Sequence, residues 1–144
     1  SGNEWDWLTD ASKELFFSQA YQLSIQSDRM GYRLEHPSLA LTRQQELVSS
    51  AVNRGTLQLL PNGKIILLMA DHQTTGGYPR LGHVASAHHH RLAQYRPGDP
   101  IYFRRVSQST AEQWMTRQQQ HLLQLRNACT FRLQEYLHAA NHQL

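Results

Sequence analysis

The feature that most constrains the fold is a tight turn, Pro61-Asn62-Gly63, between two apolar segments at residues 56–60 and 64–69. Asn-Gly between apolar runs is one of the strongest short-range signals of a β-hairpin, because both residues tolerate a positive φ. Alternating or short apolar runs bounded by turn residues predict further strands at residues 21–25, 32–34, 81–86 and 101–106. Many short strands with regular turns are typical of an antiparallel barrel or sandwich.

Two helices are expected beside these strands. Thr9 or Asp10 is placed to cap a short helix that contains residues 13–17. Residues 109–140 predict a helix about 48 Å long, with a capping box formed by Ser109 and Glu112. Its apolar stripe consists of Met115, Leu122, Leu125, Cys129, Leu133, Tyr136 and Ala140. Since this helix exceeds the length of a small barrel, we expect part of the stripe to contact a partner, and Cys129 to be a small buried apolar residue.

Composition excludes several classes of protein. A chain of 144 residues, 40% apolar, can form one domain with a core. Its longest apolar run, residues 65–70, is far shorter than the roughly 20 residues of a membrane span, and no leader is visible. A single cysteine excludes an internal disulfide, so a cytoplasmic location is expected. The arginines are scattered and the net charge is only +3, which does not indicate nucleic-acid binding.

Residues 71–79 form the sharpest candidate site, a polar loop after an apolar strand. Two glycines let the backbone turn so that its N–H groups face one point, which suits an oxyanion or a phosphate. The alternative is an ordinary β-turn in which the glycines supply positive φ. The side chains that can orient a ligand or donate hydrogen bonds to it are Asp71, Gln73, Thr74 and Thr75.

A second candidate is the segment from Asp28 to Arg33, which places one carboxylate and two guanidinium groups around Gly31. Arg29 or Arg33 can clamp a carboxylate or a phosphate through two hydrogen bonds. The alternative is an internal Asp–Arg pair that fixes a bulge. The run His88-His89-His90 does not predict a metal site, because neighbouring side chains point apart and cannot converge on one ion.

Residues 26–34 and 70–80 closely resemble two signature segments of the allophanate hydrolase subunit 2 family, also called the KipA type, which includes the C subunit of 5-oxoprolinases. The chain is also similar to part of the carboxyltransferase domain of urea carboxylase. Shorter matching segments lie at residues 5–7, 55–58, 61–63 and 92–99, in family order. Two departures are Arg54, where an apolar or aromatic residue is expected, and His89-His90, where Leu-Pro is more usual.

The resemblance implies a cyclophilin-like antiparallel β-barrel over residues 4–107, followed by a long C-terminal helix over residues 108–144. Ser1-Gly2-Asn3 is typical of an expression scar. The resemblance further implies that the chain corresponds to the C-terminal half of a full subunit. Its partners would then be the missing N-terminal half or a second copy bound through the long helix.

The activity implied by the resemblance is the ATP-dependent opening of 5-oxoproline to glutamate. The complex would use ATP with Mg²⁺, a companion of the allophanate hydrolase subunit 1 type and a third subunit, whereas the fragment alone is expected to bind no cofactor and to be inactive. Asp28 and Asp71 are expected to orient groups or act as acid or base. Arg29 and Arg33 are expected to clamp anions. The remaining expected ligand contacts are Gln73, Thr74, Thr75, Gly76, Gly77 and Tyr78, with the Thr74–Gly77 backbone as an anion cradle.

Two alternatives stay open at this stage. One is a biotin-dependent carboxyltransferase of the urea carboxylase type, which would have biotin carboxylase and biotin carrier partners. The other is a regulatory binding module that counters a kinase inhibitor and needs only an interface.

Overall fold

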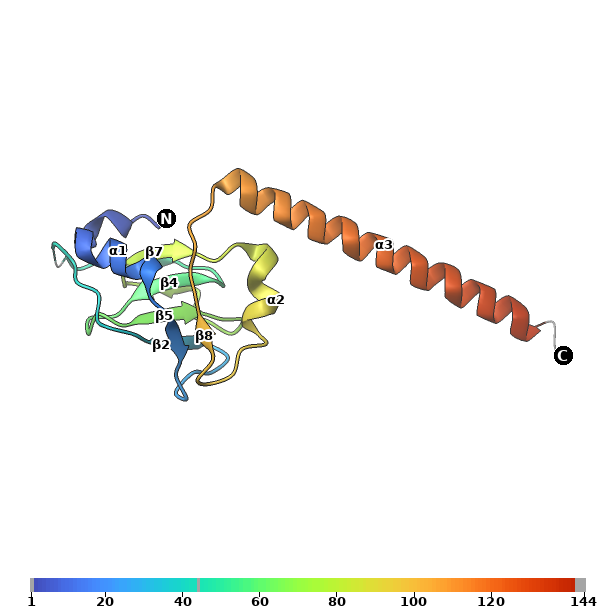
Figure 1. Ribbon diagram of the computed structural model, residues 1–144, viewed down its shortest axis with the longest axis horizontal. Helices are drawn as coiled ribbons and strands as arrows, with labels where there is room; N and C mark the ends of the chain where they lie inside the picture. The colour runs from blue at the N-terminus through green and yellow to red at the C-terminus, as the bar shows by residue number, and fades with distance from the viewer. Residues whose placement is uncertain (1, 44, 142–144) are drawn as a thin grey trace. The chain divides into compact units, whose positions relative to one another are not determined.

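This computed structural model describes residues 2–43 and 45–141 of the chain. The chain divides into two compact units, one up to Arg105 and the other from Val106 onward. The first unit contains all the strands described below, and the second consists mainly of one long helix, α3 (Figure 1).

A six-stranded antiparallel sheet is the framework of the first unit, in the order β7-β4-β5-β2-β1-β8 (Figure 1). The predicted hairpin is confirmed as β4 and β5, and Gly63 in its turn has a φ of 76°. A separate two-stranded sheet pairs β3 with β6. The strands are β1 (Tyr21–Leu23), β2 (Gly31–Glu35), β3 (Ser50–Ala51), β4 (Thr56–Leu59), β5 (Ile65–Leu68), β6 (Thr75–Gly76), β7 (Arg80–His83) and β8 (Pro100–Ile101).

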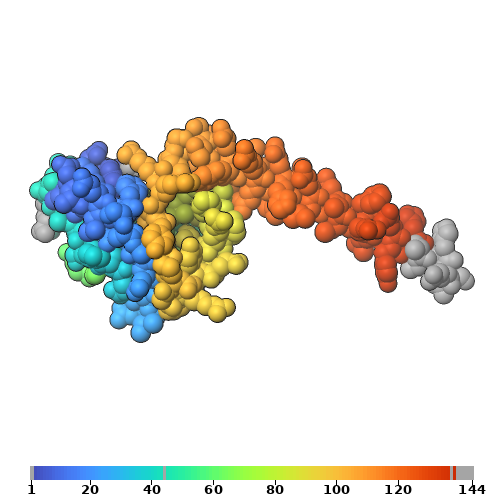
Figure 2. Space-filling view, in the orientation of Figure 1, coloured from blue at the N-terminus to red at the C-terminus, as the bar shows by residue number. Residues whose placement is uncertain are grey.

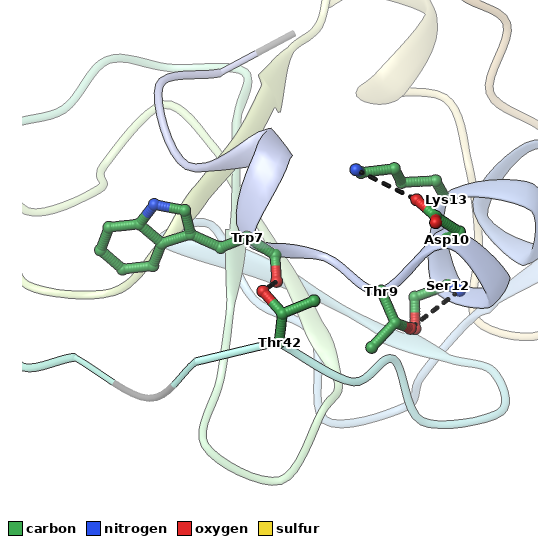
Figure 3. Close-up of polar contacts among 6 residues, drawn as sticks. All are labelled: Trp7, Thr9, Asp10, Ser12, Lys13 and Thr42. Atoms are coloured by element: carbon green, nitrogen blue, oxygen red, sulfur yellow. Dashed lines mark hydrogen bonds and ion pairs between the residues drawn. The ribbon is translucent and has the colours of Figure 1, made fainter.

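The helices of the first unit are short. They are η1 (Trp5–Trp7), α1 (Asp10–Ser18), η2 (Ser86–His88) and α2 (His89–Leu92). Thr9 caps α1 as predicted, because its hydroxyl accepts the Ser12 N–H at 3.2 Å (Figure 3). The Thr42 hydroxyl donates to the Trp7 carbonyl at 3.0 Å, which ties η1 to the segment that follows β2 (Figure 3). The Thr9 contact thus fixes the start of α1, and the Thr42 contact joins η1 to a loop distant in the chain.

The core lies on one face of the sheet. Phe16 of α1 packs against Trp5 edge to face, with ring centroids 5.1 Å apart, and stacks on Phe103 at 5.4 Å. The segment that carries Phe103 therefore lies along the N-terminal part of the unit, as Figure 2 shows in orange against blue. The largest fully buried side chains are Tyr21, Leu8, Leu34, Ile65, Leu67 and Leu81.

The predicted barrel is not closed by strand pairing in the part of the chain that the structure describes. β7 and β8 are the two ends of the sheet order, and no pairing joins them. The free edge of β7 is already covered, because the Gly2 N–H donates to the Leu81 carbonyl (2.8 Å) and the Glu4 N–H donates to the Arg80 carbonyl (3.3 Å). The prediction of a mainly antiparallel β fold with one short and one long helix is confirmed.

Three predicted strands end at least two residues earlier than expected. β7 ends at His83 instead of residue 86. β1 ends at Leu23, and Ile25 is 86% exposed, so the predicted buried face does not continue. β8 ends at Ile101 instead of residue 106. Since Ile101 pairs with Tyr21, the next residue of β8 would need a partner at Ala20, where the chain is still leaving α1. The length of its neighbour therefore limits β8.

α3 (Gln108–Asn141) begins one residue before the helix predicted from the capping box, at the first residue of the C-terminal helix that the resemblance implies. Ser107, not Ser109, caps it: its hydroxyl accepts the Thr110 N–H at 3.1 Å. Glu112 accepts a hydrogen bond from the Gln108 side chain instead of completing a capping box.

The apolar stripe of α3 is exposed along its described part, and Cys129 is exposed rather than buried. A helix that forms a unit almost alone has nothing within that unit to cover its stripe, which explains the difference. Ala140, the last predicted member, lies outside the residues whose side chains are described. Among the described residues, no helix combines the length and the apolarity needed to cross a membrane.

His36 makes the stability of the first unit sensitive to acid. Its ring is buried, with Nε2 accepting the Ile65 N–H (3.1 Å) and Nδ1 beside the Pro37 carbonyl (2.6 Å), an arrangement that fits a neutral ring. Burial lowers the pKa of His36 from its ordinary value of 6.5. The unfolded chain therefore takes up the proton first, and stability is lost as the pH falls below about 6.5.

We expect the free energy of unfolding of the first unit, followed by tryptophan fluorescence, to which the buried Trp5 contributes, to decrease between pH 7 and pH 5. The slope is expected to be smaller in His36→Gln and unchanged in His121→Gln, a substitution on the exposed surface of α3. An equal slope in wild type and His36→Gln would contradict this assignment.

Candidate functional site

The two signature segments lie side by side. Gly31 of β2 pairs with Leu68 of β5, and the pairing continues beyond the strands. The Met69 N–H donates to the Met30 carbonyl (3.0 Å), and the Asp71 N–H donates to the Arg29 carbonyl (3.1 Å). The loops that follow β5 and precede β2 are therefore held together by backbone hydrogen bonds.

A cleft of about 620 Å³ lies between the first signature segment and the small β3–β6 sheet, whose strand β6 belongs to the second segment; we call it the Arg33 cleft. Its floor is formed by Arg33 of β2, Ile66 of β5 and Gln58 of β4. These three side chains lie in a row because Ile66 pairs with both Arg33 and Gln58. Leu34, next to Arg33, points into the core, so this cleft lies on the opposite face of the sheet. The predicted residues that line it are Asp28, Arg33, Gln73, Thr75, Gly76, Gly77 and Tyr78. Arg29, Asp71 and Thr74 do not line it.

Gln58 is the site residue that sequence reasoning missed. It is only 4% exposed, lines the Arg33 cleft, and its Nε2 has no hydrogen-bond partner in the described structure. A buried amide N–H without a partner is costly, so such a group is rare unless something else binds it. In the sequence, Gln58 between Leu57 and Leu59 looks like a solvent-facing strand position, and only the cover provided by β3 and β6 makes it unusual.

The backbone cradle predicted for Thr74–Gly77 is not formed. Thr75 and Gly76 are the extended strand β6, and neither Gly76 nor Gly77 has a positive φ. Successive N–H groups of an extended strand point in opposite directions, so they do not converge on one anion. The glycines serve close packing instead: a Cβ on Gly76 would lie 2.5 Å from Nε2 of Gln58, and one on Gly77 would lie 3.1 Å from the Leu47 carbonyl oxygen.

Asp28 has a local structural task. Its carboxylate accepts the N–H groups of Met30 (2.8 Å) and Gly31 (3.0 Å) and so fixes the turn that starts β2. These hydrogen bonds, first that from Gly31, hold the pKa of Asp28 below its ordinary value. The carboxyl group is therefore ionised at neutral pH, which favours the predicted orienting role over a role as general acid.

Arg29 and Arg33 do not form a joint clamp. Arg29 makes an ion pair with Asp71 (Nε to Oδ2, 3.2 Å), and both side chains are largely exposed, which makes the pair weak. Arg33 makes no ion pair within residues 2–43 and 45–141 and lines the Arg33 cleft. Of the two predicted clamps, only Arg33 thus lines that cleft, together with the Asp28 carboxylate but without a direct ion pair among the described residues.

A second cleft of about 410 Å³, which we call the Arg54 cleft, opens at the mouth of the core. It is lined by Leu23, Ser27, Asp28, Arg29, Tyr32, Arg54, Met69, Ala70, Ala93, Tyr95 and Pro97. Tyr32 points to this side of β2, whereas its neighbour Arg33 points to the other side. The two clefts thus lie on opposite faces of β2 and share one lining residue, Asp28, in the turn before it.

The described histidines do not build a metal centre. His83 Nδ1 lies 3.2 Å from the Thr56 hydroxyl, and His89 Nε2 lies 3.1 Å from the Val84 carbonyl. Over the described ranges, no three His, Cys, Asp or Glu side chains gather in a way that can hold a metal ion.

Comparison with known proteins shows which proteins this chain is similar to. The C subunit of the 5-oxoprolinase of Escherichia coli K12 is 41% identical over 124 residues, and the Haemophilus influenzae protein of the same name is 37% identical over 124 residues. Each match covers 86% of this chain and 40% of the relative. The chain thus spans about two fifths of the length of these relatives.

Solved structures show the same fold. The urea amidolyase of Kluyveromyces lactis matches with a TM-score of 0.73 and 22% identity, over 78% of this chain and 7% of that protein. The urea carboxylase of the same organism matches with the same TM-score over 11% of its length. At this identity the likeness concerns the fold alone.

The family model described as "Carboxyltransferase domain, subdomain A and B" matches residues 1–105, the range of the first structural unit. That range includes both signature segments and both clefts. The chain therefore belongs to the carboxyltransferase domain family, subdomain A and B.

Proposed function

We propose that this chain is part of a subunit of a 5-oxoprolinase, a multi-subunit hydrolase that opens 5-oxoproline to glutamate at the expense of ATP. Its relatives at 37–41% identity are named as the C subunit of 5-oxoprolinase. The observation that supports the proposal is the presence, in one cleft, of the Arg33 guanidinium, which makes no direct ion pair among the described residues, and the buried, unpartnered Nε2 of Gln58.

5-Oxoproline matches these two groups chemically. It is a small planar ring with one carboxylate and one lactam carbonyl. Arg33 binds the carboxylate, and the Gln58 amide donates to the lactam oxygen, where negative charge develops during attack on the carbonyl. Gln73, Thr75 and Tyr78 surround the ring with further polar groups and one aromatic side chain.

ATP activates the lactam in this proposal. The lactam oxygen takes the γ-phosphoryl group and ADP leaves; one water adds to the ring carbon and the C–N bond opens; a second water releases phosphate. The Arg33 cleft offers a single guanidinium group beside the Asp28 carboxylate, which does not match a triphosphate with Mg²⁺. We therefore assign ATP binding to the rest of the complex, and substrate binding to this chain.

Carboxyl transfer is the second candidate, favoured by the family model and by the fold of urea carboxylase. Biotin would carry the carboxyl group in that reaction. Arg33 and Gln58 also suit a carboxylate and a ureido oxygen, so only an assay separates the two candidates. A regulatory module without catalysis, the remaining alternative, predicts binding to the companion subunits without turnover.

The test uses a full-length subunit that contains this chain, co-purified with its companion subunits. Glutamate release that requires both ATP and 5-oxoproline is the expected result. If no glutamate is released and the complex instead transfers a carboxyl group from a biotin carrier to a urea-like substrate, carboxyl transfer is favoured. Stable assembly without either reaction would favour the regulatory module.

Asp71→Ala is expected to lower turnover by the same complex about tenfold, with little change in the thermal stability of the first unit. The ion pair of Asp71 with Arg29 is exposed and contributes little to folding, yet it links the two segments that frame the cleft. Full turnover by Asp71→Ala would show that the ion pair with Arg29 does not position the two segments around the cleft.

A further inference from the structure

Arg54 is a charged group in an unusual place. Its guanidinium lies at the mouth of the core, in a cleft whose walls include Leu23, Met69 and the half-buried Tyr32 and Tyr95. Nη2 of Arg54 donates to the His89 carbonyl at 3.3 Å, which fixes the group in position. The buried Nε has no partner in the described structure.

No carboxylate neutralises Arg54 within residues 2–43 and 45–141. Asp28, which lines the same cleft, accepts two backbone N–H groups, and Asp71, next to the lining residue Ala70, pairs with Arg29. A cation held in a mainly apolar cleft without a counter-ion favours an anion bound from outside. The planar guanidinium suits a carboxylate.

The walls specify the rest of the ligand. A cleft of about 410 Å³ is in the size range of small-molecule sites, and most of its lining residues are apolar or aromatic. Tyrosine side chains bind flat apolar groups well. We propose that the Arg54 cleft is a second ligand site, which binds a small monocarboxylate with a planar apolar body and is separate from the Arg33 cleft.

This site does not depend on the proposed reaction. The clefts lie on opposite faces of β2, and Arg54 has no place in the Arg33 cleft. A ligand at Arg54 is therefore expected to bind whether or not the protein opens 5-oxoproline.

The experiment titrates the 144-residue chain with benzoate and follows the amide signals by NMR. Benzoate is expected to shift the signals of Gly55, Tyr32 and Tyr95, whereas benzyl alcohol, the uncharged analogue, and inorganic phosphate, the anion without an apolar body, bind at least tenfold more weakly. Arg54→Leu is expected to weaken benzoate binding at least tenfold, and Arg33→Leu to leave it unchanged.

Several results would overturn the proposal: no binding of benzoate, equal binding of benzyl alcohol, equal binding by Arg54→Leu, or shifts confined to the Arg33 cleft. If Arg54→Leu does not fold, Arg54→Lys takes its place; it keeps the charge, loses the planar fork, and is expected to bind benzoate severalfold more weakly. Equal binding by wild type and Arg54→Lys would then contradict the predicted guanidinium contact.

Discussion

Arg33→Leu is expected to lower kcat/KM for the opening of 5-oxoproline about 100-fold, chiefly by raising KM. A hydrogen-bonded ion pair between a guanidinium and a carboxylate contributes about 1.5–3 kcal/mol, which corresponds to roughly 10- to 150-fold. The carboxylate of the substrate lies away from the reacting bond, so its loss affects the ground state and the transition state alike and leaves kcat nearly unchanged. Steady-state kinetics of the assembled complex measure both constants.

Arg96→Leu is the matched control, because Arg96 is also an exposed arginine of the first unit and lies in neither cleft. Its kinetics are expected to equal those of the wild type. A similar decrease of kcat/KM in both variants would show that the overall positive charge, and not a specific contact of Arg33, determines substrate binding. Unchanged kinetics in Arg33→Leu would show that the substrate carboxylate binds elsewhere.

Glu4→Ala is expected to destabilise the first unit by about 3 kcal/mol. Glu4 is 5% exposed, and its carboxylate accepts three hydrogen bonds from Arg80: from Nε (3.0 Å), Nη2 (2.8 Å) and the backbone N–H (2.8 Å). Removing one partner of a buried ion pair leaves the other charge poorly compensated. The pair also anchors the N-terminal segment to the edge of β7. Chemical denaturation measures the difference.

Asp10→Asn is the control for this prediction, since Asp10 belongs to an exposed ion pair with Lys13 at 3.5 Å (Figure 3). We expect its effect to stay within about 0.5 kcal/mol.

The hydrogen bonds from Arg80 hold the pKa of Glu4 below its ordinary value of 4.5. The contribution of Glu4 to the free energy of unfolding is therefore fully present above pH 4.5. It is lost as the pH falls through the pKa that Glu4 has in the folded protein. Equal stability of Glu4→Ala and wild type would contradict this account.

Local signals in the sequence predicted the parts of the fold that depend on neighbours in the chain. The β4–β5 hairpin follows from Asn62-Gly63 between two apolar runs, and the Thr9 cap follows from one hydroxyl at the right position. The cap of α3 shows the limit of such signals, because Ser107 and Ser109 both suit an N-cap and only the structure decides between them.

Features that depend on distant pairing were not predictable in the same way. β8 stops where its partner strand begins, which no pattern within residues 101–106 indicates. The two signature segments, treated as separate candidates in the sequence, lie side by side in the structure. Gly76 and Gly77 proved to be spacers for Gln58 and Leu47 rather than a turn. Gln58 itself became a site residue only because Gly76 of β6 lies close over an otherwise solvent-facing position.

The central claim is that the Arg33 cleft binds 5-oxoproline. A crystal structure of the assembled complex with 5-oxoproline tests it most directly. We predict the ring in this cleft, with its carboxylate on the guanidinium of Arg33 and its lactam oxygen within hydrogen-bond distance of Nε2 of Gln58. A ligand bound on another subunit, with Gln58 still unpartnered in an empty cleft, would contradict the claim.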